Sequence, residues 1–322
     1  MTARYKTPTV PYGFIPCDWN EGDSCLGVVS YQSIDQYMRS DKWNECINMA
    51  RNILSIPNQM LLRLTSGSDI AILTTILYAS NHGLKHFRMR QNDYGQIKAF
   101  ASLAFESIEY CTDNDLLVNI KPNSLVYLSN PGNPSCRIYL EDELIACLTA
   151  HQDSVFLIDL AYIEYHPEFK VKTLANLNNL IMFRTFSKYW GVPGVRLGAI
   201  AFSQNCEFLE LYNELNSKNL SVYHYSILKQ LFENKDKVVE TRESDLRKLT
   251  EMAKAISDKF SVQYSAGGNF IRFDCINEHT KQALWNYLTA KSIMPRDLNH
   301  LPGYENSIRL SFRKAAYEKI CL

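Results

Sequence analysis

The segment Ile181-Met-Phe-Arg-Thr-Phe-Ser-Lys-Tyr-Trp-Gly-Val-Pro-Gly-Val-Arg-Leu-Gly-Ala-Ile-Ala-Phe202 decides the fold of this chain. The apolar runs at its two ends have the composition of buried strands, and the turn between them carries Ser187, Lys188 and Arg196. A lysine between two buried segments is poorly placed for solvation alone, and its amine can form an imine with a carbonyl compound. The alternative is a turn lysine whose ammonium reaches water, and this segment taken alone favours that alternative because most lysines are exposed.

Outward from this segment, short apolar runs alternate with helical patterns. We predict strands at 61–64, 86–90, 106–111, 123–129 and 154–158, and helices at 31–56, 70–79, 96–105 and 141–149. The strands are apolar on both faces, which is typical of a mostly parallel sheet covered by helices. Such sheets bind ligands beyond the carboxyl ends of their strands. The polar residues that we expect there are Ser68, Asp69, Tyr94, Asn133, Asp159, Ser187 and Lys188.

The turn before helix 70–79 is a candidate anion site. Ser66, Ser68 and Asp69 are N-cap residues by type. A turn that contains glycine also exposes the first amides of a helix, which have no partner within the helix. A capped core helix without a ligand explains the same pattern, and the turn alone favours neither reading.

The C-terminal part of the chain has a different pattern. Residues 208–260 are helical and charged with a break near 220–224, and the run 226–259 is long enough to bridge two domains. Beyond it we predict half-polar strands at 269–274, 293–298 and 307–312 and a helix at 280–291, which together indicate a small α+β domain. The predicted division is an N-terminal arm that also contributes to the small domain (1–45), a large domain (46–235) and a small C-terminal domain (236–322).

The composition favours a cytoplasmic protein without a nucleic-acid or membrane role. The 322 residues carry 34 Lys and Arg against 34 Asp and Glu, so no basic binding surface is expected. The nine cysteines occur singly, which favours reduced thiols over disulfides or a metal site. The sequence has neither an apolar signal-peptide core nor an apolar run of about 18 residues, so we expect no secretion signal and no membrane span.

The polar residues at the strand ends form one chemical set. Lys188 can form an imine, Asp159 can hold a positive charge on a ring nitrogen, and Tyr94 can stack on a flat ring. Asn133 and Tyr162 can donate hydrogen bonds to a phenolate oxygen. The residues that can bind a phosphate are Ser68, Asp69, Thr185, Ser187 and Arg196. The set fits pyridoxal 5'-phosphate (PLP), a planar, phosphorylated pyridine that carries an aldehyde.

The ordered motifs resemble those of fold-type I PLP enzymes of the class I/II aminotransferase group, and most closely its histidinol-phosphate aminotransferase and threonine-phosphate decarboxylase branch. Thr185-Phe-Ser-Lys-Tyr-Trp-Gly-Val-Pro-Gly-Val-Arg-Leu-Gly198 is similar to the branch pattern T-x-S-K-x-x-G-x-x-G-x-R-x-G. Further stretches that resemble family motifs are Gly67-Ser-Asp69, Asn92-Asp-Tyr94, Asn130-Pro-Gly-Asn-Pro-Ser135 and Ile158-Asp-Leu-Ala-Tyr162. The resemblance implies an α/β fold, with a three-layer αβα large domain around a mostly parallel sheet and a small α+β domain.

The resemblance also implies residue roles and an assembly. Lys188, Asp159 and Tyr162 take catalytic positions. Pro295-Arg-Asp297 and Ile308-Arg-Leu-Ser311 are similar to the family's V-R-D and L-R-I-T, which makes Arg309 the clamp for a substrate carboxylate and Arg296 its assistant. Asn20, beside Glu21, resembles a family segment near the substrate. The family further implies a homodimer with the active site at the subunit interface.

The chain departs from the family pattern at several positions. Cys136 stands where the family has glycine, and Leu160 and Ile70 replace acidic residues. Ser311-Phe-Arg313 replaces T-V-G, which places a bulky side chain and an added cation beside the clamp. The family's cross-subunit tyrosine has no clear counterpart, and the candidates are Trp43, Tyr31 and Tyr37.

Three functions fit these residues. The first is a PLP-dependent aminotransferase that moves an amino group from an amino acid, or an amino-acid-derived and possibly phosphorylated donor, to a keto acid, with Lys188 as general acid–base. The second is a decarboxylase resembling threonine-phosphate decarboxylase, because the same cofactor residues serve both reactions. The third is a binding protein without activity, which is disfavoured because it has no need for Lys188.

Overall fold

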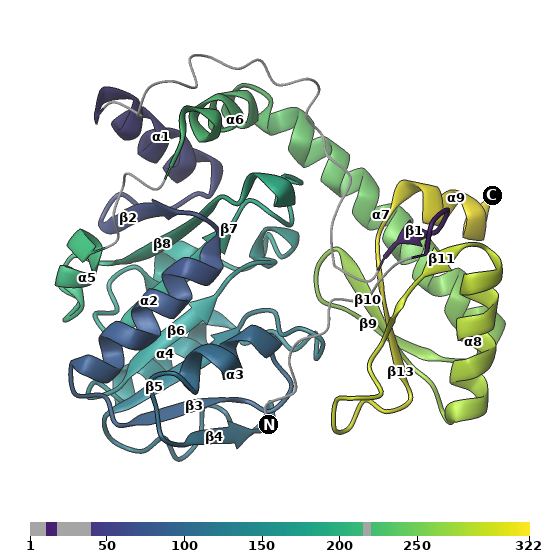
Figure 1. Ribbon diagram of the computed structural model, residues 1–322, viewed down its shortest axis with the longest axis horizontal. Coiled ribbons are helices and arrows are strands. Elements are labelled where there is room, and N and C mark those ends of the chain that lie inside the picture. The colour runs from purple at the N-terminus through teal and green to yellow at the C-terminus, as the bar shows by residue number, and fades with distance from the viewer. Residues whose placement is uncertain (1–10, 18–39, 215–219) are drawn as a thin grey trace.

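The computed structural model describes residues 11–17, 40–214 and 220–322, and its largest sheet has seven strands in the order β2-β8-β7-β6-β5-β3-β4 (Figure 1). Their bounds are β2 (Met60–Thr65), β3 (His86–Arg90), β4 (Ile108–Cys111), β5 (Ser124–Ser129), β6 (Val155–Asp159), β7 (Leu180–Thr185) and β8 (Gly198–Ser203). Strand β8 is antiparallel to both of its neighbours, and the other neighbouring pairs are parallel. The predicted mostly parallel sheet is therefore confirmed.

Each face of this sheet has its own apolar core. In β6, Phe156 and Ile158 belong to one core, and Val155 and Leu157 belong to the other. All residues of β5, β6, β7 and β8 are buried. Side chains of a strand alternate between the two faces, so strands covered on both sides are apolar throughout.

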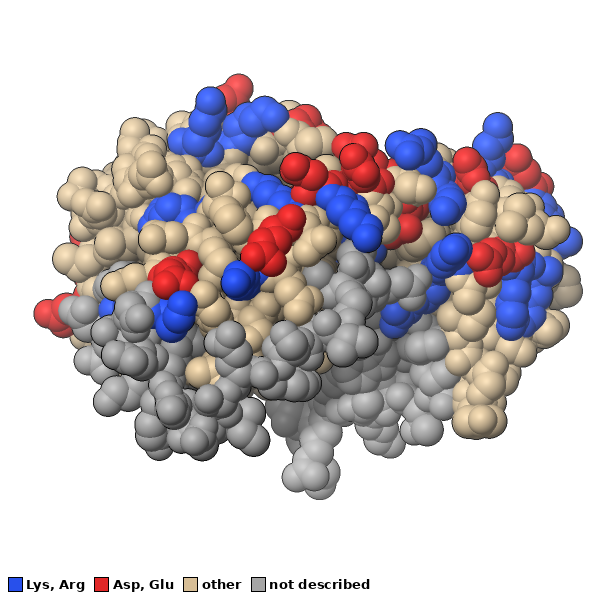
Figure 2. Space-filling model, turned by 90° about the horizontal axis from the view of Figure 1, so that it is seen from above, with Lys and Arg blue, Asp and Glu red and all other residues tan. Residues whose placement is uncertain are grey.

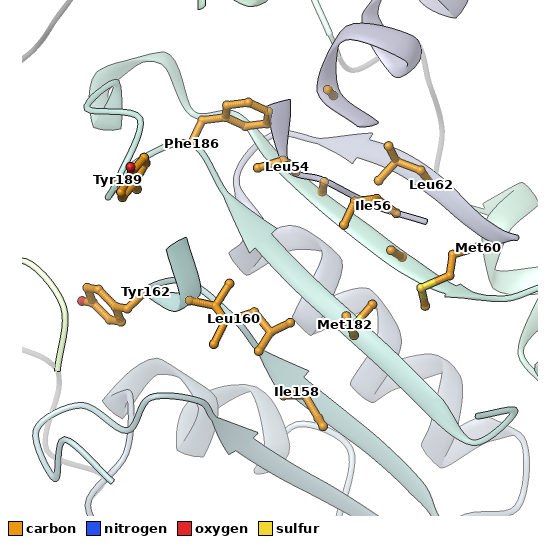
Figure 3. Close-up of a cluster of buried hydrophobic side chains, with 14 of the residues drawn as sticks. Leu54, Ile56, Met60, Leu62, Ile158, Leu160, Tyr162, Met182, Phe186 and Tyr189 are labelled. Carbon is orange, nitrogen blue, oxygen red and sulfur yellow. The ribbon is translucent and has the colours of Figure 1, made fainter. Parts of the chain in front are cut away.

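Helices cover both faces and complete three layers (Figure 1). Helices α2 (Ser68–Asn81) and α3 (Gly95–Ala101) share a core with one face of the sheet, to which Leu211 of α5 (Leu209–Glu214) also belongs. Helices α1 (Ser40–Ile53), α4 (Glu141–Ala150) and α6 (Val222–Glu233) pack on the opposite face. Figure 3 shows part of that second core, where Leu62, Ile158 and Met182 come from three strands of the sheet.

The C-terminal part builds a separate antiparallel sheet in the order β12-β13-β10-β9, with its own apolar core. Its strands are β9 (Gln263–Ala266), β10 (Phe270–Asp274), β12 (Arg296–Asp297) and β13 (Ser307–Ser311), and the helices near it are α8 (Glu278–Ala290) and α9 (Lys314–Cys321). Helix α7 (Lys235–Phe260) runs from α6 to this sheet and contacts β9, β10 and α9 (Figure 1). The predicted small α+β unit is therefore present.

The pairing of the chain's first strand bears on the domain boundaries. Strand β1 (Ile15–Pro16) pairs in parallel with β11 (Ile293–Met294), and Cys17 belongs to the core of the smaller sheet. Helix α1 instead packs with the large sheet and with α6. The contacts of residues 15–17 support our proposal that an N-terminal arm (1–45) contributes to a small domain (236–322), with a large domain (46–235) between them, whereas the last residues of the arm belong to α1 and pack with the large domain.

Helix α2 begins differently from its prediction. Its N-cap residue is Gly67, and no side chain caps the helix, so the candidates Ser66, Ser68 and Asp69 were wrong as caps. Gly67 has φ of 80°, a conformation that costs little energy only for glycine. The turn thus brings the backbone close to the helix end, and the first amides of α2 stay without a side-chain cap.

Other elements differ mainly in length. The helix predicted at 96–105 ends at Ala101, where the chain turns and Ser102 Oγ donates to the Lys98 carbonyl. The strand predicted at 293–298 is split into β11 and β12, which belong to different sheets, because Pro295 between them has no amide to donate to a ladder. The run predicted at 226–259 breaks at Asn234, between α6 and α7. Residues 31–39 of the helix predicted at 31–56 lie outside the described residues.

Charged side chains are interspersed on the face seen in Figure 2, where lysine and arginine alternate with aspartate and glutamate. Within the described ranges, no helix is both long and apolar enough to span a lipid bilayer.

Candidate functional site

The turn after β7 holds Lys188 in a defined backbone. The Phe186 amide donates to the Leu197 carbonyl at 3.0 Å, and the Gly191 amide closes the turn by donating to the Lys188 carbonyl at 3.1 Å. The side chain of Lys188 is half-buried, and its Nζ lies 5.9 Å from the ring centroid of Tyr162. In Figure 3, Phe186 and Tyr189 extend from this turn and Tyr162 from the segment that follows β6.

A chain of polar contacts leads from Tyr162 to the smaller sheet. Asn133 Nδ2 donates to the Tyr162 hydroxyl at 3.4 Å, and Asn133 Oδ1 accepts from Arg309 Nη1 at 2.7 Å. The Tyr162 ring packs edge-to-face on Phe270, with centroids 5.2 Å apart. The structure therefore brings Lys188, Tyr162, Asn133 and Arg309 to one place, although they come from four segments of the chain.

The five predicted phosphate residues converge around the start of α2. Thr185 lies opposite Gly198 in the pairing of β7 with β8, and its Oγ1 accepts from the Ser187 amide at 3.2 Å. A Cβ at Gly198 would lie only 2.3 Å from the Ser68 nitrogen, so the absence of a side chain there lets β8 approach the helix end. Arg196 Nη2 pairs with Asp69 Oδ2 at 3.2 Å, and its side chain is 53% exposed. We call Ser68, Asp69, Thr185, Ser187 and Arg196 the phosphate cup.

This cup has the features of an anion site. It combines the amino end of a helix of 14 residues with hydroxyl groups and a guanidinium. Arg196 has φ of 53° in the left-handed region, and the Val195 carbonyl before it is bonded to His224 Nε2 at 3.0 Å. The backbone just before Arg196 is thus held, and the guanidinium keeps an exposed side that can meet a ligand while it pairs with Asp69.

Asp159 ends β6 and is buried beside the same region. Its oxygens accept hydrogen bonds from two neutral donors, the Tyr127 hydroxyl at 3.0 Å and the Ala161 amide at 3.1 Å. The pKa of Asp159 is raised to about 7, mainly by burial and also by the charges of Asp93 and Asp69, while the hydrogen bonds from Tyr127 and Ala161 lower it. A cation next to Asp159 would favour its ionised form, so the carboxyl fits a protonated ring nitrogen.

Tyr94 precedes α3 and is held through its backbone. Its amide donates to Asp93 Oδ1 at 2.8 Å, and Asp93 is buried between Arg90 Nη1 at 3.0 Å and Ser129 Oγ at 2.5 Å. The half-buried Tyr94 side chain interacts electrostatically with Tyr127, the residue that donates to Asp159. This interaction places Tyr94 near the buried carboxyl of Asp159, where a residue that stacks on the cofactor ring is required.

The predicted substrate arginines lie side by side on the smaller sheet. Arg296 of β12 pairs in register with Arg309 of β13, which pairs with Arg272 of β10, so the three side chains point to the same face. His300, in the loop between β12 and β13, has its pKa lowered by burial and by Arg296 and Arg309. The remaining substrate candidate, Asn20, lies outside the described residues.

Sequence reasoning missed Arg272. Its Nη1 donates to the Pro134 carbonyl at 3.0 Å and to the Ser135 carbonyl at 2.7 Å, and its Nε donates to Asp274 Oδ1 at 2.8 Å. These bonds tie the smaller sheet to the loop that carries Asn133. The sequence signal that could have identified Arg272 is an arginine between apolar neighbours in Phe270-Ile-Arg-Phe-Asp274. The same pattern is typical of any strand with one solvent-exposed face, so it does not single out a functional residue.

The departures from the family pattern are accommodated locally. Cys136 has φ of 62°, the left-handed conformation that its usual glycine would adopt, and burial raises the pKa of its thiol to about 12. Leu160 is fully buried in the apolar core, whereas Ile70 is 43% exposed on α2. Of the candidates for the cross-subunit tyrosine, Trp43 is buried, and Tyr31 and Tyr37 lie outside the described residues.

Comparisons with known proteins give one family. Residues 84–321 match the model of the family described as aminotransferase class I and II. Histidinol-phosphate aminotransferase of Ruminiclostridium cellulolyticum is 28% identical over 204 residues, which are 62% of this chain and 54% of that relative. The chain therefore spans about half the length of the curated relatives it matches.

Solved structures share the fold. A putative histidinol-phosphate aminotransferase from Erwinia carotovora atroseptica superposes with a TM-score of 0.76 at 17% identity, over 95% of this chain and 94% of that one. Histidinol-phosphate aminotransferase from Sinorhizobium meliloti, solved in complex with pyridoxal-5'-phosphate, gives 0.76 at 16% identity, over 95% and 88% of the two chains. The predicted fold class is thereby confirmed.

Proposed function

Because this chain belongs to the class I and II aminotransferase family, whose cofactor is PLP, we propose that it transfers an amino group between an amino acid, or an amino-acid derivative, and a keto acid. The observation that carries the proposal is the convergence of Lys188, the phosphate cup and Asp159 at one edge of the large sheet. An amine, an anion site and a buried carboxyl without a cationic donor are the groups that PLP requires.

The residues of the site suit the cofactor group by group. The phosphate cup would hold the phosphate through the amino end of α2 and Arg196. Asp159, whose pKa is raised to about 7 by burial, would become an ionised partner for the ring nitrogen. Asn133 and Tyr162 lie within reach of one another and would donate to the same ring oxygen. When bound, PLP supplies an aldehyde for the amino group and a ring that accepts electrons.

The remaining steps belong to side chains of the chain itself. Lys188 Nζ would first accept the proton from the substrate Cα and then donate it again during the transfer, and so would act as a general acid–base. Arg309 would bind the substrate carboxylate, and Arg296 would support it from the neighbouring strand. Tyr94 would cover one face of the ring and keep water from it.

The cationic cluster on the smaller sheet bears on the substrate class. Arg296, Arg309 and His300 lie within electrostatic reach of one another, so the pocket suits a donor with one or two anionic groups. An amino acid or a phosphorylated amino alcohol has this chemistry. Histidinol phosphate, the substrate in the names of the relatives, is one candidate donor.

We also propose a cytoplasmic homodimer with the active site at the subunit interface. The family supports the dimer, and α2 offers apolar surface beside the phosphate cup, since Ile70 is 43% and Leu77 is 38% exposed on the same side of the helix. The singly spaced cysteines suit a reducing compartment.

A screen of amino donors tests the function. Purified protein loaded with PLP is mixed with single amino acids or phosphorylated amino alcohols, and the visible absorbance is followed as amino groups are transferred. We expect loss of the visible band and stoichiometric keto product with at least one donor, and recovery of the band when a keto acid is added. Release of CO₂ without a keto product would replace the aminotransferase by the decarboxylase, and no response to any donor would overturn both.

A further inference from the structure

Arg242, in the middle of α7, is one of the most buried charged residues described, with 1% exposure. Its Nε donates to the backbone carbonyl of Tyr189 at 2.6 Å, and its Nη1 pairs with Asp245 Oδ2 at 2.7 Å. A guanidinium is costly to bury, and the bonds of Arg242 include one to a backbone carbonyl and one to a carboxylate. Tyr189 is the residue that follows Lys188.

The turn of Lys188 is held from a second side as well. Trp190 Nε1 donates to Glu164 Oε1 at 3.1 Å, and the same oxygen accepts from Arg184 Nη2 at 2.7 Å. The Tyr189 ring packs edge-to-face against Tyr165, with centroids 5.0 Å apart. Side chains thus fix the turn towards the large sheet, while Arg242 fixes its backbone from α7.

Helix α7 reaches the substrate side of the site. It contacts β10, the strand that pairs with the strand of Arg309. A small cavity beside Arg242 is lined by Tyr165, which belongs to a core of the large sheet, and by Asn269 and Phe312, which adjoin strands β10 and β13 of the smaller sheet. Arg242 therefore lies where the turn that carries Lys188 meets the smaller sheet that carries Arg309.

We infer that Arg242 is a positioning residue that aims the Lys188 amine by holding the Tyr189 carbonyl. The inference rests on the proposed aminotransferase function. With the Tyr189–Trp190 peptide fixed, the backbone that bears Lys188 keeps one orientation relative to α7 and so to Arg309. A displacement of about 1 Å at a reacting group costs up to roughly 10²-fold in rate, without a matching loss in substrate binding.

The test compares Arg242→Gln with Arg247→Gln, which removes the same charge from an exposed position on the same helix. Hydrogen exchange of peptides covering 186–192 is measured in the cofactor-free protein, together with kcat and KM for the best donor. For Arg242→Gln we expect at least about tenfold faster exchange in the turn and about tenfold lower kcat, with KM within about twofold. Arg247→Gln should match the parent protein in each measurement.

Parent-like exchange and kcat in a folded Arg242→Gln protein would overturn the inference. If that variant does not fold, Arg242→Lys is measured in its place. Lysine keeps the charge but lacks the planar guanidinium that bonds the Tyr189 carbonyl and Asp245 at the same time. A melting temperature near the parent's with lower kcat and faster turn exchange supports positioning, and unchanged kcat overturns it. Failure of the proposed function is a separate result, since it would appear as a parent protein that reacts with no donor while the exchange difference persists.

Discussion

The two halves of the site are built in different ways. In the cofactor half, made of Lys188, Asp159 and the phosphate cup, Asp159 ends β6 and Lys188 follows β7, and every residue of these two strands is buried. The substrate half is a row of half-buried arginines, Arg296, Arg309 and Arg272, on a smaller sheet. The cofactor half is held in place by the backbone and the apolar cores of the large sheet. The substrate half is joined to it by side-chain hydrogen bonds, such as the one from Arg309 to Asn133.

This difference predicts different responses to substitution. Changes in the cofactor half should remove chemistry for every substrate, because all of them use the same cofactor. Changes in the substrate half should alter which donor is accepted and leave the cofactor bound, because these arginines lie on the smaller sheet, whose core is separate from those of the large sheet.

The largest expected effect comes from the cofactor half. Lys188→Ala should lower kcat by about 10²- to 10⁴-fold for all donors, because it removes the general acid–base. The protein should also no longer retain PLP covalently after borohydride reduction, as judged by peptide mass spectrometry. Lys172→Ala, an exposed lysine preceding the same strand, is the matched control and should behave like the parent. Full turnover in Lys188→Ala would remove this lysine from the mechanism.

The substrate half should respond selectively. Arg309→Gln would remove the charge-assisted bond that we propose to the substrate carboxylate, and such bonds are each worth about 1.5–3 kcal/mol. We expect KM for carboxylate donors to rise roughly 10- to 100-fold, with little change for an amine donor that has no carboxylate. Steady-state kinetics with the two donors side by side checks this, and an equal loss for both would place Arg309 outside the clamp.

Asp159 offers a stability test of the cofactor half. In the cofactor-free fold its pKa is about 7, against 3.8 for the ordinary carboxyl. The unfolded chain therefore releases this proton near pH 4 while the folded chain keeps it, so this group's contribution to stability falls as pH rises from about 4 to 7 and stays low above that. At pH 8, Asp159→Asn should raise the melting temperature of the cofactor-free protein, by roughly 2–6 °C.

The matched control for this test is Asp153→Asn, an exposed aspartate just before the same strand. Its melting temperature should follow that of the parent at each pH. With PLP added, the order should reverse, because only the ionised carboxyl of Asp159 stabilises a protonated ring nitrogen. A melting temperature for Asp159→Asn below the parent's at pH 8 without PLP would contradict the assignment.

The smallest effect is expected at the link between the halves. Arg272→Gln would remove the bonds to the Pro134 and Ser135 carbonyls and loosen the loop that carries Asn133. A bond from a charged donor contributes about 1.5–3 kcal/mol to stability. These bonds hold the loop and do not touch the substrate, so we expect KM to rise only about two- to fivefold with kcat nearly unchanged. Donor titrations at constant PLP measure this, and a loss of bound PLP in the variant would show that the halves are not separable.

The cofactor half was predictable because its residues are adjacent in the sequence. Thr185, Ser187, Lys188 and Arg196 stand in one connection between two recognisable strands, and the structure pairs Arg196 with Asp69 at the start of α2. Their order also carries the family resemblance, which the family match confirms. The individual roles of these residues stay predictions.

The substrate half was less predictable because register, not sequence spacing, assembles it. Arg272 joins Arg296 and Arg309 only through the pairing of β12, β13 and β10, which no local pattern reveals. The N-cap of α2 was misassigned for a related reason, since the polar residues Ser66 and Ser68 fit a cap by type but Gly67 alone supplies the required backbone. Arg242 was missed because a charged helix gives no sign of which arginine turns inward.

The antiparallel pairing of β7 with β8 has a consequence for how the chain reaches this structure. The two strands are joined by the turn that carries Lys188 and Arg196, so their contacts close a short loop and cost little chain entropy. The pairing of β8 with β2, in which Gly198 lies opposite Thr65, closes a much longer one. The amine and the guanidinium can therefore take their relative places early in folding, and the helix end that completes the phosphate cup is added to a turn already formed.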